Sequence, residues 1–247
     1  MARTYDGEPP AALATRLGVP SLSLYARVGS TMDAAHELGA AGAPAGSLAL
    51  AEAQTAGRGR QGSAWRSAPA SGIWLTLLER PEDAAAVRVL SLRVGVAAAA
   101  ALDPFADAPV QLKWPNDLFV RGRKLAGVLV EARWRGARLD WVAIGLGVNV
   151  VPPTGLANAA GLRDSVSRLD VLASLVPAVR AAAAAAGPLD RRELDEFAAR
   201  DIARGRRCLR PAPGVVAGVT AAGELAVHTP AGIRHYRSGS LVLQEGT

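Results

Sequence analysis

The amino-acid sequence predicts an α+β fold, with a mixed β-sheet flanked by helices and a small C-terminal β-barrel. Three observations lead to this prediction. Up to about residue 205, stretches with the apolar alternation of strands are interspersed with stretches that have the apolar period of helices. The helical stretches end at glycine or proline residues. The residues after 205 contain only short strand patterns. We therefore expect two domains, residues 1–205 with the mixed sheet and residues 206–247 with the barrel.

The elements of the first domain follow in chain order. Residues 1–20 contain three prolines and the amphipathic stretch Ala11–Leu17, which we expect to form a lead-in segment. Ser30 or Thr31 suits a helix N-cap, because either hydroxyl can accept a hydrogen bond from the first turn. The expected elements are a helix at Met32–Leu38, strands at Ser47–Ala53 and Gly72–Leu78, a helix at Leu90–Leu102, strands at Val110–Trp114, Leu118–Val120, Val128–Trp134 and Asp140–Val148, and helices at Ser167–Ala186 and Arg191–Arg204.

The tail from Cys208 onward has a different pattern. Short apolar stretches alternate with Ala-Gly turns at residues 222–223 and 231–232, which is typical of a compact β meander. The expected strands are Gly214–Val219, Glu224–Thr229 and Ile233–Val242.

Composition limits the class of protein. Half of the 247 residues are apolar and about a fifth are charged, as in ordinary globular domains. No uncharged apolar stretch reaches the roughly 18 residues of a transmembrane helix, and the N-terminus lacks the apolar core of a secretory signal. The single cysteine, Cys208, excludes an internal disulfide and argues against a structural zinc site. We expect a cytoplasmic protein with no membrane partner.

The net charge of +6 raises the question of nucleic-acid binding. The arginines are scattered and alternate with acidic residues, as in Asp190–Glu196, and no helix-turn-helix or Cys/His finger pattern is present. We therefore expect a diffusely basic surface and no nucleic-acid partner. The only lysines are Lys113 and Lys124, which lie within one twelve-residue segment. Because ammonium and guanidinium groups bind differently, this placement indicates that the ammonium chemistry matters there.

A glycine–arginine loop occupies residues 55–71. Its segment Gly57–Gly62 spells G-x-G-x-x-G, but Pro69 and the absence of apolar periodicity exclude the helix that a dinucleotide-binding turn needs. Ser63 stands where a Walker A motif needs lysine, so that motif is excluded too. Arg58 and Arg60 instead present two guanidinium forks suited to a carboxylate or phosphate, with Trp65 able to stack on a ring. Taken alone, the loop also fits an exposed turn with incidental arginines.

Three further segments carry polar groups at strand ends. In Lys113–Asp117 (KWPND) a proline interrupts a strand pattern, as at strand ends and bulges. Lys124–Glu131 (KLAGVLVE) places Gly127 where a ligand can approach the backbone closely. Gly145–Val150 (GLGVNV) ends the next strand with small residues and the amide of Asn149.

Together with Ser30–Met32 and Gln54–Arg60, these segments resemble the biotin–protein ligase family in motif, order and spacing. The resemblance covers residues 28–151 well and the C-terminal barrel more loosely. It implies the class II synthetase-like fold of biotin and lipoate ligases. It also implies an ATP- and Mg²⁺-dependent, AMP-forming ligase that makes biotinyl-5′-AMP and transfers biotin to a lysine of a carrier domain, with an acyl-CoA carboxylase as the expected owner of that domain.

The resemblance also implies roles for individual residues. Lys124, Arg58 and Arg60 would act in catalysis. Biotin would be bound by Ser30, Thr31, Met32, Gln54, Gly57, Arg58, Gly59, Arg60, Lys124 and Gly127. The nucleotide would be bound by Arg60, Trp65, Asn116, Lys124 and Asn149, and Asp117 is the candidate magnesium contact. These cations suit the chemistry, because a carboxylate must attack an anionic phosphate and fixed positive charge offsets the repulsion.

The chain departs from the family in two places. Ser63 replaces an arginine that is usual in bacterial members, which bears on affinity for the intermediate. Only twenty-nine residues precede Ser30, so we expect a monofunctional form without the N-terminal DNA-binding domain of repressor-type members. A non-catalytic module that binds biotin or biotinyl-AMP and a lipoate ligase are the alternatives, and the sequence leaves open a monomer or a homodimer.

Overall fold

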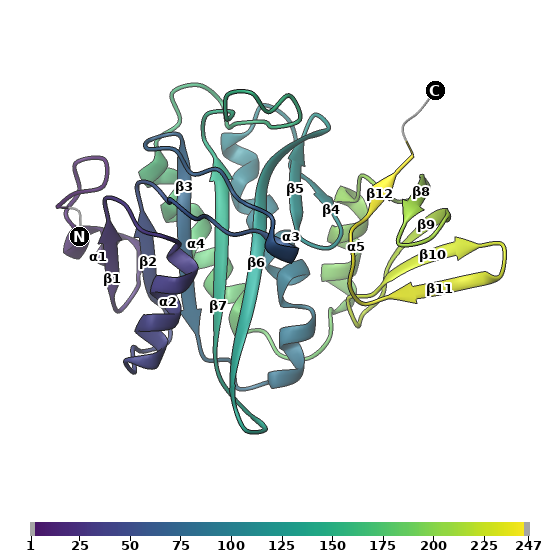
Figure 1. Ribbon diagram of the computed structural model, residues 1–247, viewed down its shortest axis with the longest axis horizontal. Coiled ribbons are helices and arrows are strands. Elements are labelled where there is room, and N and C mark those ends of the chain that lie inside the picture. Colours follow the sequence, from purple (N-terminus) through teal and green to yellow (C-terminus); the bar gives the residue numbers. More distant parts are fainter. Residues whose placement is uncertain (1–2, 245–247) are drawn as a thin grey trace.

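A computed structural model describes residues 3–244 and contains two β-sheets (Figure 1). The larger sheet has seven strands in the order β1-β2-β3-β7-β6-β5-β4, and β1 and β2 are parallel whereas the other neighbours are antiparallel. The predicted mixed sheet flanked by helices is therefore confirmed. Its strands are β1 (Leu22–Tyr25), β2 (Ser47–Ala51), β3 (Gly72–Glu79), β4 (Gln111–Lys113), β5 (Asp117–Val120), β6 (Arg123–Arg135) and β7 (Arg138–Asn149).

Five α-helices accompany this sheet in the part of the chain that the structure describes: α1 (Pro10–Leu17), α2 (Thr31–Ala40), α3 (Leu90–Leu102), α4 (Arg168–Ala184) and α5 (Arg191–Arg200). Helices α3 and α4 cover one face of the sheet, and α2 lies on the other (Figure 1). None of the helices within residues 3–244 is both long enough and apolar enough to cross a membrane.

The two faces of the sheet differ in side-chain size because neighbouring strand residues point to opposite faces. Under α3 and α4, the strands contribute large apolar residues such as Leu48, Leu50 and Ile144 to the main core. Under α2 they contribute small ones, including Ala49 and Ala143. The small residues let α2 pack closely and leave room beside it, and this is where the candidate site lies.

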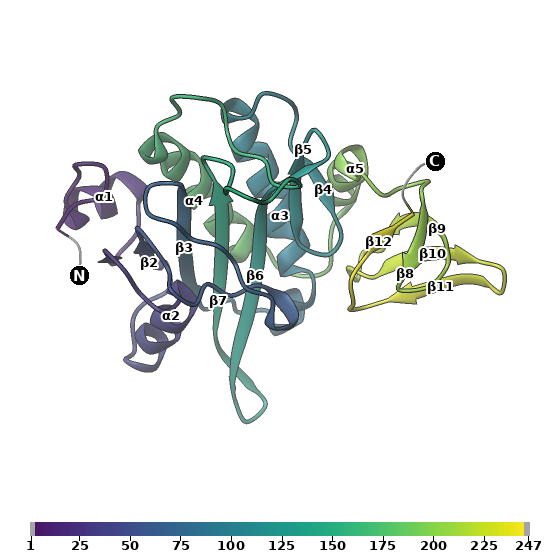
Figure 2. The same cartoon turned by 45° about the horizontal axis from the view of Figure 1, so that its top comes forward.

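The second sheet is antiparallel, with the strand order β11-β10-β9-β8-β12, and lies beside the β4 edge of the first (Figure 2). The predicted all-β appendage is thus present, and within residues 3–244 its edge strands β11 and β12 are not paired with each other. The indole of Trp114 donates a hydrogen bond to the Gly223 carbonyl oxygen at 3.1 Å and so ties this sheet to the first. The strands are β8 (Arg207–Arg210), β9 (Gly214–Val219), β10 (Leu225–Thr229), β11 (Gly232–Tyr236) and β12 (Val242–Leu243).

Several predicted boundaries were wrong. The helix expected at Arg191–Arg204 ends at Arg200, because the following chain extends and Ile202 donates its N–H to the Leu112 carbonyl. The strand expected at Ile233–Val242 is two strands, β11 and β12. Strand β6 starts at Arg123 rather than Val128, and strands β1 and β8 were not predicted.

A buried arginine fastens the N-terminal segment to the sheet. Arg168, at the start of α4, is only 7% exposed. Its guanidinium forms hydrogen bonds with both carboxylate oxygens of Asp6 and both of Glu52, and it lies 4.2 Å from the centre of the Tyr5 ring. Burial raises the pKa of the Tyr5 hydroxyl well above its ordinary value. Three segments distant in sequence therefore meet at one cation.

Candidate functional site

A cavity of about 1210 Å³ lies on the α2 side of the large sheet, between the glycine–arginine loop and strands β6 and β7. Of the fourteen predicted site residues, the structure brings thirteen together in its lining: Ser30, Thr31, Met32, Gln54, Arg58, Gly59, Arg60, Trp65, Asn116, Asp117, Lys124, Gly127 and Asn149. Gly57, which belongs to the glycine–arginine loop, is not in the lining. A Cβ there would be 2.5 Å from the Trp65 carbonyl oxygen, so the position accepts only glycine without movement of the loop backbone.

The charges around the cavity are strongly unbalanced. Five cationic side chains line it, and within residues 3–244 the one acidic residue in the lining is Asp117. The cations are Arg58, Arg60, Arg66, Lys113 and Lys124. A concave surface lined by one sign of charge concentrates ligands of the opposite sign. The cavity therefore suits an anionic ligand.

Lys124 is held by both its side chain and its backbone. Its ammonium Nζ lies 2.6 Å from a carboxylate oxygen of Asp117. Its backbone N–H donates to the Asn158 carbonyl at 2.8 Å, and its carbonyl accepts from Ala160 N–H at 2.8 Å and from Asn149 Nδ2 at 3.4 Å. The ammonium thus projects from a fixed backbone position at the start of β6.

The two predicted asparagines bind protein groups in this structure. Asn116 donates from Nδ2 to the Val128 carbonyl at 2.7 Å, and its Oδ1 accepts from Arg60 Nη1 at 3.4 Å. Asn149 uses its Nδ2 for the Lys124 carbonyl. Each amide therefore orients the backbone or the side chain of a neighbouring cation.

Burial lowers the pKa of two of the cationic side chains that line the cavity. It lowers the pKa of Lys113 below the usual range, and the nearby positive charges of Lys124 and Arg206 add to this effect while Asp117 opposes it. Burial also lowers the pKa of the Arg60 guanidinium, against the opposing charge of Asp117. Both groups lose hydration, so a bound anion would replace contacts that water no longer provides.

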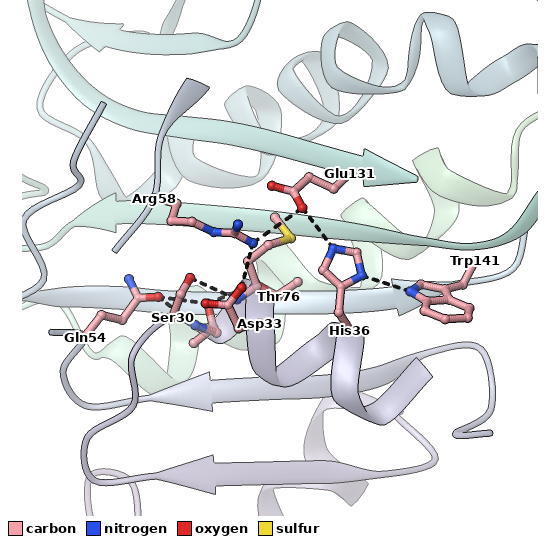
Figure 3. Close-up of polar contacts among 10 residues, drawn as sticks. Ser30, Asp33, His36, Gln54, Arg58, Thr76, Glu131 and Trp141 are labelled. Atoms are coloured by element: carbon pink, nitrogen blue, oxygen red, sulfur yellow. Dashed lines mark hydrogen bonds and ion pairs between the residues drawn. The ribbon is translucent and has the colours of Figure 1, made fainter. Parts of the chain in front are cut away.

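At the N-terminus of α2, the side chains of Thr31, Gln54 and Thr76 form a hydrogen-bonded group beside the Ser30 hydroxyl (Figure 3). The Ser30 hydroxyl accepts from Met32 N–H at 3.2 Å and caps the helix, as predicted. The Gln54 carbonyl oxygen accepts from both the N–H and the hydroxyl of Thr31, at 2.8 and 3.2 Å. Thr76 Oγ1 donates to Thr31 Oγ1 at 2.9 Å. The group fixes several polar atoms at one end of the cavity.

Two paired glycines form a flat floor on which Trp65 lies. Gly127 and Gly147 are register partners in β6 and β7. A Cβ at Gly147 would be 2.5 Å from the indole, and one at Gly127 would be 3.2 Å from it. Lys124 Nζ lies 5.2 Å from the centre of the Trp65 ring, and Trp65 Nε1 is buried without a hydrogen-bond partner within residues 3–244. The glycines therefore make room for a planar group beside a cation.

Some lining residues were missed by the sequence prediction. Thr76 on β3 reaches the site only through sheet pairing, and Ser240 and Leu241 come from the loop between β11 and β12. The loop at residues 153–159 closes another side. Its turn residues Pro153 and Gly155 mark a loop in the sequence, but they carry no signal for ligand binding.

Residues 24–149 match the model of the biotin/lipoate A/B protein ligase family. The chain is 39% identical over 124 residues to the bifunctional ligase/repressor BirA of Bacillus spizizenii, a stretch that covers 50% of this chain and 38% of that protein. It is also 39% identical over 133 residues to a biotin–acetyl-CoA-carboxylase ligase of Paracoccus denitrificans, covering 51% of this chain and 53% of that protein.

The fold is also similar to a solved structure. Biotin protein ligase from Aquifex aeolicus in complex with biotin and ATP superposes with a TM-score of 0.74 at 24% identity, covering 92% of this chain and 100% of that one.

Proposed function

Because the chain belongs to the biotin/lipoate A/B protein ligase family, we propose that it is a biotin–protein ligase, which activates biotin with ATP and transfers it to a lysine of a carrier protein. The observation that carries this proposal is the cavity, whose lining brings Lys124, Arg58 and Arg60 together with the slot that Gly127 and Gly147 leave for Trp65. The matched stretch covers only 38% of the first curated relative, so the activity rests on the site as well as on the family.

In the first step, a biotin carboxylate oxygen attacks the α-phosphorus of ATP, and the bond to pyrophosphate breaks. Both reacting groups are anionic, so the main barrier that the protein can lower is electrostatic. Lys124 is assigned to the carboxylate and α-phosphate. Arg58 and Arg60 are assigned to the anhydride, and Trp65 to the adenine side. Ser30, Thr31 and Gln54 supply hydrogen-bonding atoms for biotin, with Met32, Gly59 and Gly127 beside them.

Mg²⁺ is the metal expected with ATP, and the residues fit it. Mg²⁺ usually binds one or two carboxylates together with phosphates and water. Asp117 is the one carboxylate in the lining within residues 3–244, and the same described residues contain no cluster of three or more His, Cys, Asp or Glu side chains for a metal. A cation carried mainly by the phosphates would neutralise part of their charge when bound.

In the second step, the ε-amine of an acceptor lysine attacks the carbonyl carbon of biotinyl-5′-AMP. An amide bond forms, the acyl–phosphate bond breaks and AMP leaves with its phosphate. The acceptor is proposed to be the biotin carrier domain of an acyl-CoA carboxylase. The division into a catalytic domain at residues 1–205 and a C-terminal domain at 206–247 is part of the same proposal.

The direct test incubates the purified protein with biotin, ATP, Mg²⁺ and a biotin-carrier domain, and detects product with streptavidin. A carrier whose acceptor lysine is changed to arginine serves as control. Pyrophosphate release without carrier labelling would favour the binding-module alternative over transfer, and preferential use of lipoate would favour a lipoate ligase. Neither pyrophosphate nor labelled carrier would contradict the proposed function.

Alkaline pH is expected to weaken ATP binding through Lys113. Because burial lowers its pKa, Lys113 loses its charge at a lower pH than an ordinary lysine. The KM for ATP should therefore rise by about tenfold as pH increases from neutrality toward 10, the cost of one charged contact. Arginine stays protonated throughout this range. Lys113→Arg should remove most of the rise in a pyrophosphate-release assay, and an identical rise in both proteins would exclude a contact between Lys113 and ATP.

Gly147→Ala is expected to weaken ATP binding by about tenfold or more, the usual cost of losing one base–aromatic stack. The new methyl group would displace the Trp65 indole, which lies 2.5 Å from the Cβ position. Isothermal titration with ATP measures the effect. Gly95→Ala is the matched control, because its Cβ would meet only Leu112, at an ordinary 3.6 Å. Equal affinity in the two variants would exclude a role for the slot in nucleotide binding.

A further inference from the structure

Arg58 reaches from the glycine–arginine loop to a chain of polar side chains outside the predicted site (Figure 3). Its Nη2 lies 2.9 Å from a carboxylate oxygen of Asp33 on α2 and 3.4 Å from one of Glu131 on β6. Glu131 is the less exposed carboxylate, with 25% of its side chain accessible against 55% for Asp33. The loop is thus fastened to both elements through one nitrogen.

A half-buried histidine, His36, holds Glu131 in turn. His36 Nε2 lies 3.0 Å from the same Glu131 oxygen that faces Arg58. On the other side of the ring, the Trp141 indole N–H donates to His36 Nδ1 at 3.0 Å. An indole nitrogen can only donate, so Nδ1 is the acceptor and Nε2 carries the proton. The neutral imidazole therefore donates to Glu131 and fixes its orientation.

This arrangement leaves the rest of the Arg58 fork free. Within residues 3–244, all side-chain partners of Arg58 are on Nη2, and the arginine also lines the cavity. A guanidinium has donors on three nitrogens in a fixed plane. Anchoring one of them sets the direction of the other two without occupying them.

We propose that Glu131, oriented by His36 and assisted by Asp33, is a positioning residue that fixes the Arg58 fork and the glycine–arginine loop for an anionic ligand. The link to biotinyl-5′-AMP rests on the proposed function, but the effect on the loop does not. A positioned arginine loses less conformational freedom when it binds, so the anchor should slow release of the intermediate.

Four substitutions test the chain of contacts. Glu131→Gln removes the charge but can still accept from His36. His36→Asn keeps an acceptor for Trp141 and loses the donor to Glu131, whereas His36→Gln keeps a donor near the Nε2 position. Glu196→Gln is the control, because Glu196 pairs with Arg192 at 2.9 Å on α5, away from the cavity.

Two measurements follow. The first is hydrogen exchange of amides 57–65 in the ligand-free protein, and the second is the release rate of biotinyl-5′-AMP. Glu131→Gln and His36→Asn should each raise both by about three- to tenfold, whereas His36→Gln and Glu196→Gln should change them less than twofold. In an Arg58→Ala background, Glu131→Gln should add less than twofold, because it acts through Arg58.

Unchanged loop exchange in Glu131→Gln, or an equal effect with and without Arg58, would overturn the proposal. Because exchange is measured without ligand, it decides the positioning role even if the wild-type protein forms no adenylate. A wild-type protein that forms no adenylate would count against the proposed function alone.

Discussion

Lys124→Ala is expected to reduce the rate of biotinyl-adenylate formation by about 10²–10³-fold, the usual cost of removing one group that stabilises developing charge. Lys124 Nζ lies 5.2 Å from the centre of the Trp65 ring, and the Asp117 carboxylate and the hydrogen bonds of the Lys124 backbone hold it in place. Initial rates of pyrophosphate release, with saturating biotin and ATP, measure the effect.

The variant should remain folded, since the Lys124 side chain is 35% exposed and alanine can keep the same backbone hydrogen bonds. Arg123→Ala is the matched control, because it removes an exposed cation from the adjacent position of β6. A Lys124→Ala rate within about threefold of the wild type would exclude the assignment of this lysine to the reacting phosphate.

Arg168→Met is expected to lower the free energy of unfolding by about 3–5 kcal/mol, the usual cost of removing one partner from a buried ion pair. Asp6 and Glu52 would keep their charges without a counter-ion, and the Tyr5 ring would lose its cation. For a chain of this size, the melting temperature should fall by about 6–20 °C.

Thermal denaturation followed by circular dichroism measures this change. Arg192→Met is the control: Arg192 pairs with Glu196 on the exposed side of α5, and its loss should leave the melting temperature unchanged. If both variants melted like the wild type, Arg168 could not be the fastening between the N-terminal segment and the sheet.

The sequence predicted most of the fold because the signals for its longer elements are local. Helix α3 (Leu90–Leu102) and strand β9 (Gly214–Val219) have the predicted bounds, and the N-cap of α2 was also predicted. Strand β1, by contrast, is four residues long, and its identity depends on parallel pairing with β2. That pairing is formed by distant parts of the chain, and no local periodicity reports it.

The same limit applies to the site. Motif residues such as Lys124 could be assigned to one site from their type, order and spacing. Thr76 and Ser240 could not, because Thr76 reaches the cavity through sheet pairing and Ser240 through the loop between β11 and β12. Glu131 was within a recognised motif, yet its contact with Arg58 depends on where the loop folds back over β6. Partners of this kind require the tertiary structure.

The placement of the two lysines limits how readily the protein's own amines can be acylated. A mixed anhydride that escapes into solution acylates accessible amines, and surface lysines are its usual targets. Here the other 26 of the 28 basic Lys and Arg side chains are arginines, which stay protonated and do not react as amines at neutral pH. Lys113 and Lys124 both line the cavity, where Lys124 is paired with Asp117. Under the proposed function, few of the protein's own side chains could therefore be labelled by biotinyl-5′-AMP that escapes from the cavity.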